Sequence, residues 1–400
     1  MANLSTLSSQ DFLKKASAVA AHYGFIALDN LEKGEPGPKR SDAEFPEISE
    51  AVRKDPFGNI AASLLAHCSA KNFMTVRRKE PTLIYYAATP GKRALGTQSK
   101  QRPVKFGLAV LGCPKSIGEA LIIKTSLAIL EELGVQNSTV YVNSVGDRDS
   151  AARFGRELTN YLKRHIEELT PAMQQALKRD PFEALETLME SSIPLRETLP
   201  RPLHFLSEVS RRHLREVLEF LELDGIPYSI EDQLVGHRDC YTQTLFEIRH
   251  PHGEPGEQRT LVRGGRCDEL ARKNFRSNVP VVGAVFEHEP VKKAETPVQK
   301  TKSRAPKFFL VQLGFSAKLL SLSVLESLRK AHIPVHQTIN NDSLSEQLEA
   351  AKFTKTPYLL IMGQREVLDR TVIVRNATSQ AQEIVPLQIL TDYLKTSLKI

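Results

Sequence analysis

The sequence predicts an α+β protein, in which an antiparallel sheet with flanking helices precedes a smaller α/β domain. Residues 242–262 place apolar runs on both sides of a Gly- and Pro-containing turn, which is typical of two antiparallel strands. Residues 287–306 are rich in proline, lysine and threonine, which indicates a flexible basic linker. Residues 307–400 alternate strand-like and helix-like patterns, as an α/β sandwich with a mixed sheet does.

The composition is that of an ordinary globular protein. Its 400 residues are 41% hydrophobic and 25% charged, which is enough for a substantial core and for two or three domains. The N-terminus has no apolar signal-peptide core and no stretch is long and apolar enough to span a bilayer, so we expect a cytoplasmic protein without membrane insertion. The four cysteines show no CxxC spacing, which predicts neither a metal site nor a disulfide framework.

The net charge of +7 favours a polyanionic partner such as nucleic acid. A mild lysine excess that only keeps the chain soluble is the alternative. The absence of tryptophan and the aromatic content of 6% disfavour base-stacking platforms of the kind found in single-strand binders.

Periodicity and breakers place the other elements. Helical spacing is clear in residues 7–23, 117–133 and 202–224, and each run ends at a glycine. Residues 150–188 read as helices broken near Pro171 and Pro181. Strands are expected at 84–89, 138–147 and 279–286, and a short helix at 267–275. Residues 31–75 give no clear pattern.

Two motifs resemble the histidine-recognition strands of histidyl-tRNA synthetase, where Arg-Gly-Leu-Asp-Tyr-Tyr-Thr-Gly-Thr-Val-Phe-Glu precedes Gly-Gly-Arg-Tyr-Asp-Gly-Leu. The matching positions of the first are Asp239, Tyr241, Thr242, Thr244, Phe246 and Glu247. Those of the second are Gly264, Gly265, Arg266, Asp268 and Leu270. The resemblance implies a ligand pocket that involves Thr89, Asp239, Tyr241, Thr242, Thr244, Gly264, Gly265 and Arg266.

Further resemblance extends along the chain. The family's Asn-Ser-x-Gly-Asp is present at Asn143, Ser144, Gly146 and Asp147, and its C-terminal Val-x-Val-Arg-Asn at Val372, Val374, Arg375 and Asn376. The resemblance implies a class II synthetase-like core at 1–286, with a helical insertion at about 150–200, and an anticodon-binding-like domain at 307–400. The regulatory subunit of ATP phosphoribosyltransferase is a related case in kind.

The sequence departs from the family where its active enzymes carry charge. The arginine that opens the first motif falls on Gly236, and the glutamate of Leu-Arg-Pro-Glu-Gly-Thr falls on Ala87. The glutamine and glutamate that contact substrate fall on Lys105 and Ala109. Neither Phe-Arg-x-Glu nor Gly-Leu-Glu-Arg is present. Arg238, two residues after Gly236, is a candidate to replace the lost arginine if both lie on one strand face.

Loss of several such groups predicts a pseudoenzyme, because electrostatic stabilisation dominates adenylate formation. We expect a synthetase-like homodimer that binds tRNA or a regulatory protein partner and needs no cofactor or metal. A divergent but active histidine–tRNA ligase, which uses ATP and Mg²⁺, is the alternative. A purely structural dimer is a third reading.

Overall fold

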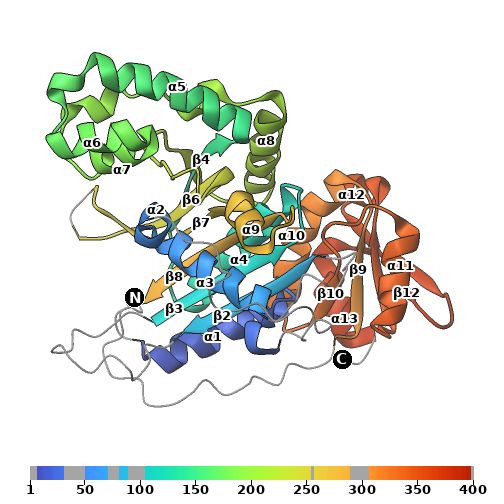
Figure 1. Ribbon diagram of the computed structural model, residues 1–400. Helices are drawn as coiled ribbons and strands as arrows, with labels where there is room; N and C mark the ends of the chain where they lie inside the picture. The colour runs from blue at the N-terminus through green and yellow to red at the C-terminus, as the bar shows by residue number, and fades with distance from the viewer. Residues whose placement is uncertain are drawn as a thin grey trace.

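The computed structural model describes residues 7–30, 50–70, 81–88, 104–253, 256–288 and 306–397. Figure 1 shows a central sheet with helices on both faces, a helical lobe above it, and a second sheet at the C-terminal side. Predictions for residues 31–49, for Thr89 and for most of the 287–306 linker lie outside the described residues. No helix in the described ranges has the length and hydrophobicity that a membrane crossing requires.

The central sheet has eight strands in the order β1-β2-β3-β8-β7-β6-β4-β5. Their bounds are β1 Ile26–Ala27, β2 Thr82–Ala88, β3 Val104–Leu111, β4 Thr139–Gly146, β5 Tyr228–Ile230, β6 Thr242–Pro251, β7 Gln258–Arg266 and β8 Val281–His288. The six central strands pair antiparallel, whereas the edge strands β1 and β5 pair parallel with their neighbours. The predicted antiparallel sheet with flanking helices is confirmed.

Alternation along the strands divides the core between the two faces of this sheet. Phe246 and Ile248 point to the face covered by α1 (Ser9–His22), α4 (Ile117–Glu132) and α8 (Glu208–Leu223). Leu245 points to the opposite face. There it packs in one cluster with residues of α3 (Pro56–Ala70) and α9 (Asp268–Phe275). The short α2 (Glu50–Lys54) leads into α3. Neither α2 nor α3 was predicted from the sequence, because residues 31–75 show no clear pattern.

The predicted helical insertion forms a lobe with its own core. It comprises α5 (Arg148–Arg164), α6 (Pro171–Arg179) and α7 (Pro181–Met189), which bury residues such as Phe154, Leu158 and Phe182. Pro171 and Pro181 stand at the starts of α6 and α7, where a missing N–H is tolerated, as the breaks predicted. Asp180 caps α7 by accepting from the Phe182 N–H at 2.9 Å.

The C-terminal part is an α/β layer with a mixed five-stranded sheet in the order β10-β9-β11-β12-β13. The strands are β9 Phe308–Gln312, β10 Val335–Gln337, β11 Tyr358–Met362, β12 Thr371–Asn376 and β13 Gln382–Pro386. The helices are α10 Phe315–Lys330, α11 Leu344–Phe353, α12 Gln364–Asp369 and α13 Leu390–Ser397. The predicted alternation is confirmed, except that the short α12 was not anticipated.

The C-terminal part shares a continuous apolar cluster with α1, α4 and α8. At its edge, the Tyr23 hydroxyl donates to Glu326 of α10 at 2.5 Å, and Arg329 donates to the same carboxylate at 2.8 Å. Burial alone would raise the pKa of Glu326, but the bonds from Arg329 and Tyr23 outweigh it and lower the pKa to about 2. Ser323 of α10 also donates to Asp224, next to the end of α8.

Candidate functional site

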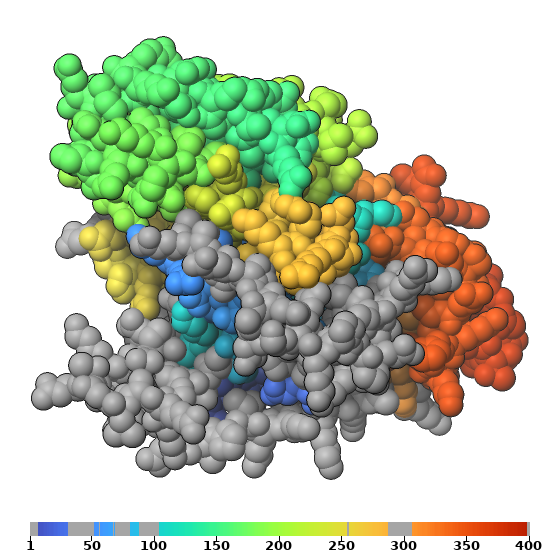
Figure 2. Space-filling model, in the orientation of Figure 1, coloured from blue at the N-terminus to red at the C-terminus, as the bar shows by residue number. Residues whose placement is uncertain are grey.

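A cleft of about 610 Å³ lies between the helical lobe and the α3 face of the central sheet. Residues of α7 line one side, and residues of β6 and β7 line the other. Residues 233–236 and the junction between α2 and α3 complete its wall. Figure 2 shows the helical lobe as a distinct body standing over the rest of the core. We call this space the α7 cleft.

The sheet side of the α7 cleft is a charged network centred on Glu247. Glu247 on β6 lies directly opposite Arg263 on β7, and the two form an ion pair. Arg249 donates to the Glu247 carboxylate at 2.7 Å, and the Thr260 hydroxyl donates to the same carboxylate at 3.1 Å. Arg263 also reaches Asp55, at 3.3 Å. Burial would lower the pKa of Arg263, but the carboxylate of Glu247 outweighs it, so the pKa stays above its usual value.

Asp55 is a site residue that the motif comparison missed. It stands between α2 and α3, where its carboxylate accepts from the Gly58 N–H at 2.7 Å and from the Tyr241 hydroxyl at 3.1 Å. The resemblance places the glutamate of Leu-Arg-Pro-Glu at Ala87. Ala87 is exposed on β2, where it pairs with Phe106 of β3, and it does not line the cleft. The apolar–Arg–x–acid spacing of residues 52–55 was the available signal.

The helical side of the cleft is acidic. Glu183 and Glu186 line it from α7, and Glu190, the residue that follows the helix, lines it one turn further on. Arg179 pairs with Glu183 at 3.0 Å. Burial raises the pKa of Glu186 to about 7, with repulsion from Asp55, Glu190 and Glu183 adding to the effect and Lys54 opposing it.

This raised pKa predicts how the stability of the protein depends on pH. The folded-state pKa of Glu186 lies above its ordinary 4.5, so its contribution to stability is complete below about pH 4.5 and is lost as the pH rises through about 7. We therefore expect Glu186→Gln to be more stable than the unchanged chain at pH 8, with a smaller difference at pH 5.

Urea unfolding at pH 5, 6, 7 and 8 measures this difference. Glu346→Gln on the exposed side of α11 is the matched control and should show no such trend. A Glu186→Gln variant whose stability relative to the unchanged chain does not increase between pH 5 and pH 8 would contradict the raised pKa of Glu186.

Gly236 lies at the cleft wall, and the ring of Tyr241 fills the space beside it. A Cβ built on Gly236 would approach the Tyr241 ring to 2.2 Å. That ring is buried, stacked on Phe57 with ring centroids 5.4 Å apart, and tied to Asp55 through its hydroxyl. The position at which the family carries arginine therefore has no room for a side chain of any kind while Tyr241 stays in place.

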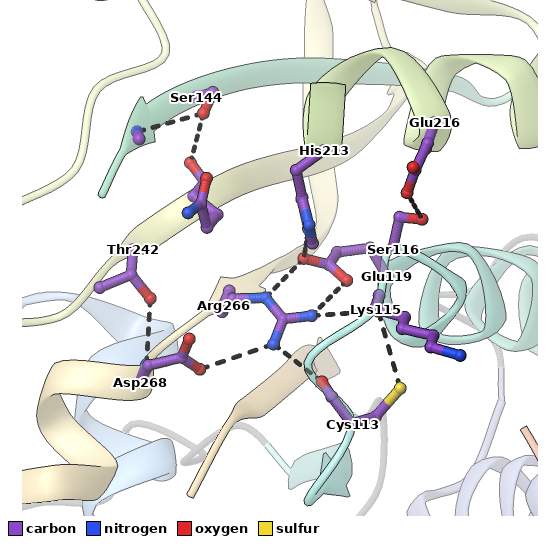
Figure 3. A network of polar contacts seen from close by, with 12 residues as sticks. Cys113, Lys115, Ser116, Glu119, Ser144, His213, Glu216, Thr242, Arg266 and Asp268 are labelled. Carbon is purple, nitrogen blue, oxygen red and sulfur yellow. Dashed lines mark hydrogen bonds and ion pairs between the residues drawn. The ribbon is translucent and has the colours of Figure 1, made fainter. Parts of the chain in front are cut away.

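Arg266 is held in a buried network on the other side of β7 (Figure 3). It is 1% exposed and donates twice to Glu119 of α4, from Nε at 2.7 Å and from Nη2 at 2.6 Å. Nη1 donates to the Cys113 carbonyl at 2.9 Å, and His213 of α8 contacts Glu119 at 2.6 Å. Burial would raise the pKa of Glu119, but Arg266 and His213 lower it to about 2. Arg266 thus joins the sheet to α4 and does not face the α7 cleft.

The other residues of the two motifs lie beside α9 and under the sheet surface. Thr242 accepts from the Asp268 N–H at 3.1 Å, and Lys273 donates to Asp239 at 2.9 Å. Thr244 is fully buried. None of the described residues predicted for the ligand pocket lines the α7 cleft; these are Asp239, Tyr241, Thr242, Thr244, Gly264, Gly265 and Arg266. Their ligand-binding role stays a prediction, and Thr89 is outside the described residues.

Arg238 does not lie on a strand, so the prediction that it shares a strand face with Gly236 is wrong. Residues 236–241 form a turn, so strand alternation does not set the direction of this side chain. Arg238 donates to Asp180 at 2.6 Å, and its Cζ lies 5.3 Å from the centre of the Phe182 ring. It connects the turn to the start of α7. In the described ranges no group of His, Cys, Asp and Glu side chains is arranged to hold a metal ion.

Comparison with known proteins agrees with this architecture. Residues 307–397 match the family described as "Anticodon binding domain". Histidine–tRNA ligase 1 of Shouchella clausii is 28% identical over 324 residues, which cover 80% of this chain and 76% of that protein. Histidine–tRNA ligase of Bacillus subtilis is 27% identical over 327 residues, with the same coverage of 80% and 76%. The crystal structure of apo Staphylococcus aureus histidyl-tRNA synthetase superposes with a TM-score of 0.51 at 20% identity, covering 96% of this chain and 95% of that one.

Proposed function

Because the chain belongs to the histidyl-tRNA synthetase-like family and carries an anticodon-binding domain, we propose that it is a non-catalytic member that acts by binding RNA. The observation that carries this proposal is the packing of the Tyr241 ring against Gly236. It leaves no place for the guanidinium that would offset negative charge during adenylate formation. Loss of one such donor typically costs about 3 kcal/mol of transition-state stabilisation.

The charges in the α7 cleft support the same proposal. Arg263 pairs with Glu247 and Asp55, while Arg249 lies 2.7 Å from Glu247 and 3.6 Å from Glu231. A triphosphate would have to break these pairs, and it would face the acidic side of α7 at the same time. A site for ATP and Mg²⁺ is therefore poorly matched by the described residues of this cleft.

The apolar cover of the sheet supports it as well. Ala109 and Gly283 lie under α3, whose Phe57, Ile60 and Leu64 leave a gap of only about 10 Å³ above the strands. A space of this size holds at most a single water molecule. The sheet surface at Ala109, where the resemblance places a substrate contact, is thus occupied by the protein itself.

We expect the purified chain to catalyse no histidine-dependent exchange of pyrophosphate into ATP. The assay is run with Mg²⁺ at high protein concentration, beside a catalytically active histidine–tRNA ligase as positive control. Saturable, histidine-dependent exchange would instead establish the alternative, a divergent ligase. The position of Asp55 in the cleft is the observation that favours this alternative, since a carboxylate there can hold an amino group.

The binding half of the proposal is tested with tRNA. In filter binding over a salt series, the logarithm of the affinity should fall linearly with the logarithm of the salt concentration, because bound cations are released from the phosphates. We also propose a homodimer in the cytoplasm, which sedimentation of the same preparation would show as twice the 44.7 kDa of one chain. If the chain binds no tRNA, the RNA-binding proposal is wrong and a regulatory protein is the remaining proposed partner.

A further inference from the structure

Phe353, the last residue of α11, is exposed in a way that is unusual for phenylalanine. Its side chain is 90% exposed, the largest fraction among the large apolar side chains in the described ranges. The buried positions of α11 are Gln347 and Ala351. Phe353 follows Ala351 by two residues, about 200° around the helix, so it points away from the side that packs on the sheet.

The residues next to Phe353 in sequence are polar and include two lysines, while the exposed Glu349 lies one turn earlier on the same side of α11. Lys352 and Lys355 flank it and are both exposed. Lys355 adopts a left-handed backbone with φ of 54°, and its N–H donates to the Lys352 carbonyl at 3.0 Å. The chain therefore turns tightly immediately after the helix, so Lys352 and Lys355 stand on either side of Phe353 in a short segment.

This turn lies at one end of the C-terminal sheet, beside further basic residues. The Tyr358 N–H donates to the Lys307 carbonyl at 3.2 Å, and the Ala377 N–H donates to the Pro357 carbonyl at 2.9 Å. Lys307 and the turn after β12 are thus neighbours of the loop that follows Phe353. Arg375 of β12 contacts Gln380, a neutral partner, so this contact does not offset its charge.

We propose that Phe353, with Lys352 and Lys355, is a stacking site for one unpaired base of an RNA loop. This inference rests on the proposed RNA-binding function and assigns a place to it. An exposed ring offers a flat face to a base, and cations beside it contact the flanking phosphates. A protein-docking patch needs adjoining apolar side chains, whereas the sequence neighbours here are Lys352, Thr354 and Lys355, and the residue one turn earlier is Glu349. The low aromatic content of the chain disfavours a row of such sites but not a single one.

The test uses the full chain and two RNA probes, a hairpin with an unpaired loop and a fully paired duplex of equal length. Fluorescence anisotropy measures the affinity of each. Phe353→Ala is expected to weaken hairpin binding by roughly fivefold to a hundredfold and to leave duplex binding unchanged. Phe353→Trp should retain hairpin binding, and Phe353→Leu, which keeps an apolar side chain without a ring, should behave like Phe353→Ala.

Two controls separate stacking from other effects. Leu368→Ala removes a 77% exposed apolar side chain from α12 and should change neither affinity. Lys352→Ala with Lys355→Ala should reduce the salt slope of hairpin binding by roughly 0.7 per lysine, whereas Phe353→Ala should not change it. Thermal unfolding of each variant should match the unchanged chain, because these side chains are exposed.

The outcomes distinguish this inference from the proposed function. If the unchanged chain binds the hairpin and Phe353→Ala binds it equally well, the stacking site is wrong while the RNA-binding function stands. Hairpin binding retained by Phe353→Leu would also overturn stacking. If the unchanged chain binds neither probe, the RNA-binding function fails and the stacking site fails with it.

Discussion

Glu119→Gln is expected to lower the free energy of unfolding by about 3–5 kcal/mol, because it removes the buried carboxylate nearest to the Arg266 guanidinium and leaves only Asp268, at 3.6 Å, among the described carboxylates. The Glu119 and Arg266 side chains are at most 1% exposed, so water cannot replace the lost charge. The low pKa of Glu119, about 2, has a second consequence. The stabilisation is complete above the ordinary pKa of about 4.5 and is lost as the pH falls toward 2.

Urea unfolding at pH 7 measures the change, with Glu269→Gln as the matched control. Glu269 also pairs with arginines, Arg148 at 2.7 Å and Arg272 at 2.9 Å, but these arginine side chains are 66% and 42% exposed. An exposed pair of this kind is worth at most about 1 kcal/mol. If both variants lost the same free energy of unfolding, burial would not be what sets the strength of the ion pair between Arg266 and Glu119.

Gly264→Ala is expected to destabilise the protein by about 3 kcal/mol, at the upper end of the usual range for overpacking. A Cβ on Gly264 would lie 2.4 Å from the Gly283 carbonyl oxygen of β8 and 2.5 Å from the Phe246 ring. The carbonyl belongs to the backbone of the neighbouring strand, so it cannot move away without disturbing the sheet.

Gly107→Ala is the control, because Gly107 lies on β3 of the same sheet. The nearest atoms to a Cβ there are 3.6 Å away, an ordinary contact distance. Chemical denaturation should therefore show a large loss for Gly264→Ala and a small change for Gly107→Ala. A Gly264→Ala variant as stable as Gly107→Ala would contradict the close packing of β7 on β8.

Local patterns predicted most of the fold. Apolar runs around a turn gave β6 and β7, and Pro171 and Pro181 marked the starts of α6 and α7, because these signals act over a few residues. The short α12 and the pair α2 and α3 were missed. Six residues of α12 carry too few turns for helical periodicity to show.

The site was harder to predict, since a motif gives the identity of a residue and not its contacts. Arg266 matched a ligand-binding motif, yet its partner Glu119 lies 147 positions away in the sequence. Arg238 was predicted to lie on a strand, but it lies in a turn and donates a hydrogen bond to Asp180. Asp55 lines the cleft, although residues 31–75 show no clear sequence pattern. In each case tertiary contacts decided the role of the side chain.

The joint between the two sheets ties the C-terminal part to the core. Tyr23, Glu326 and Arg329 seal a common apolar interior, so the C-terminal part cannot swing relative to α4 and α8 without opening that interior to water. The spacing between the C-terminal part and the central sheet is therefore set by the fold. Under the proposed RNA-binding function, an RNA that contacts Phe353 and the core at once would have to match this fixed spacing.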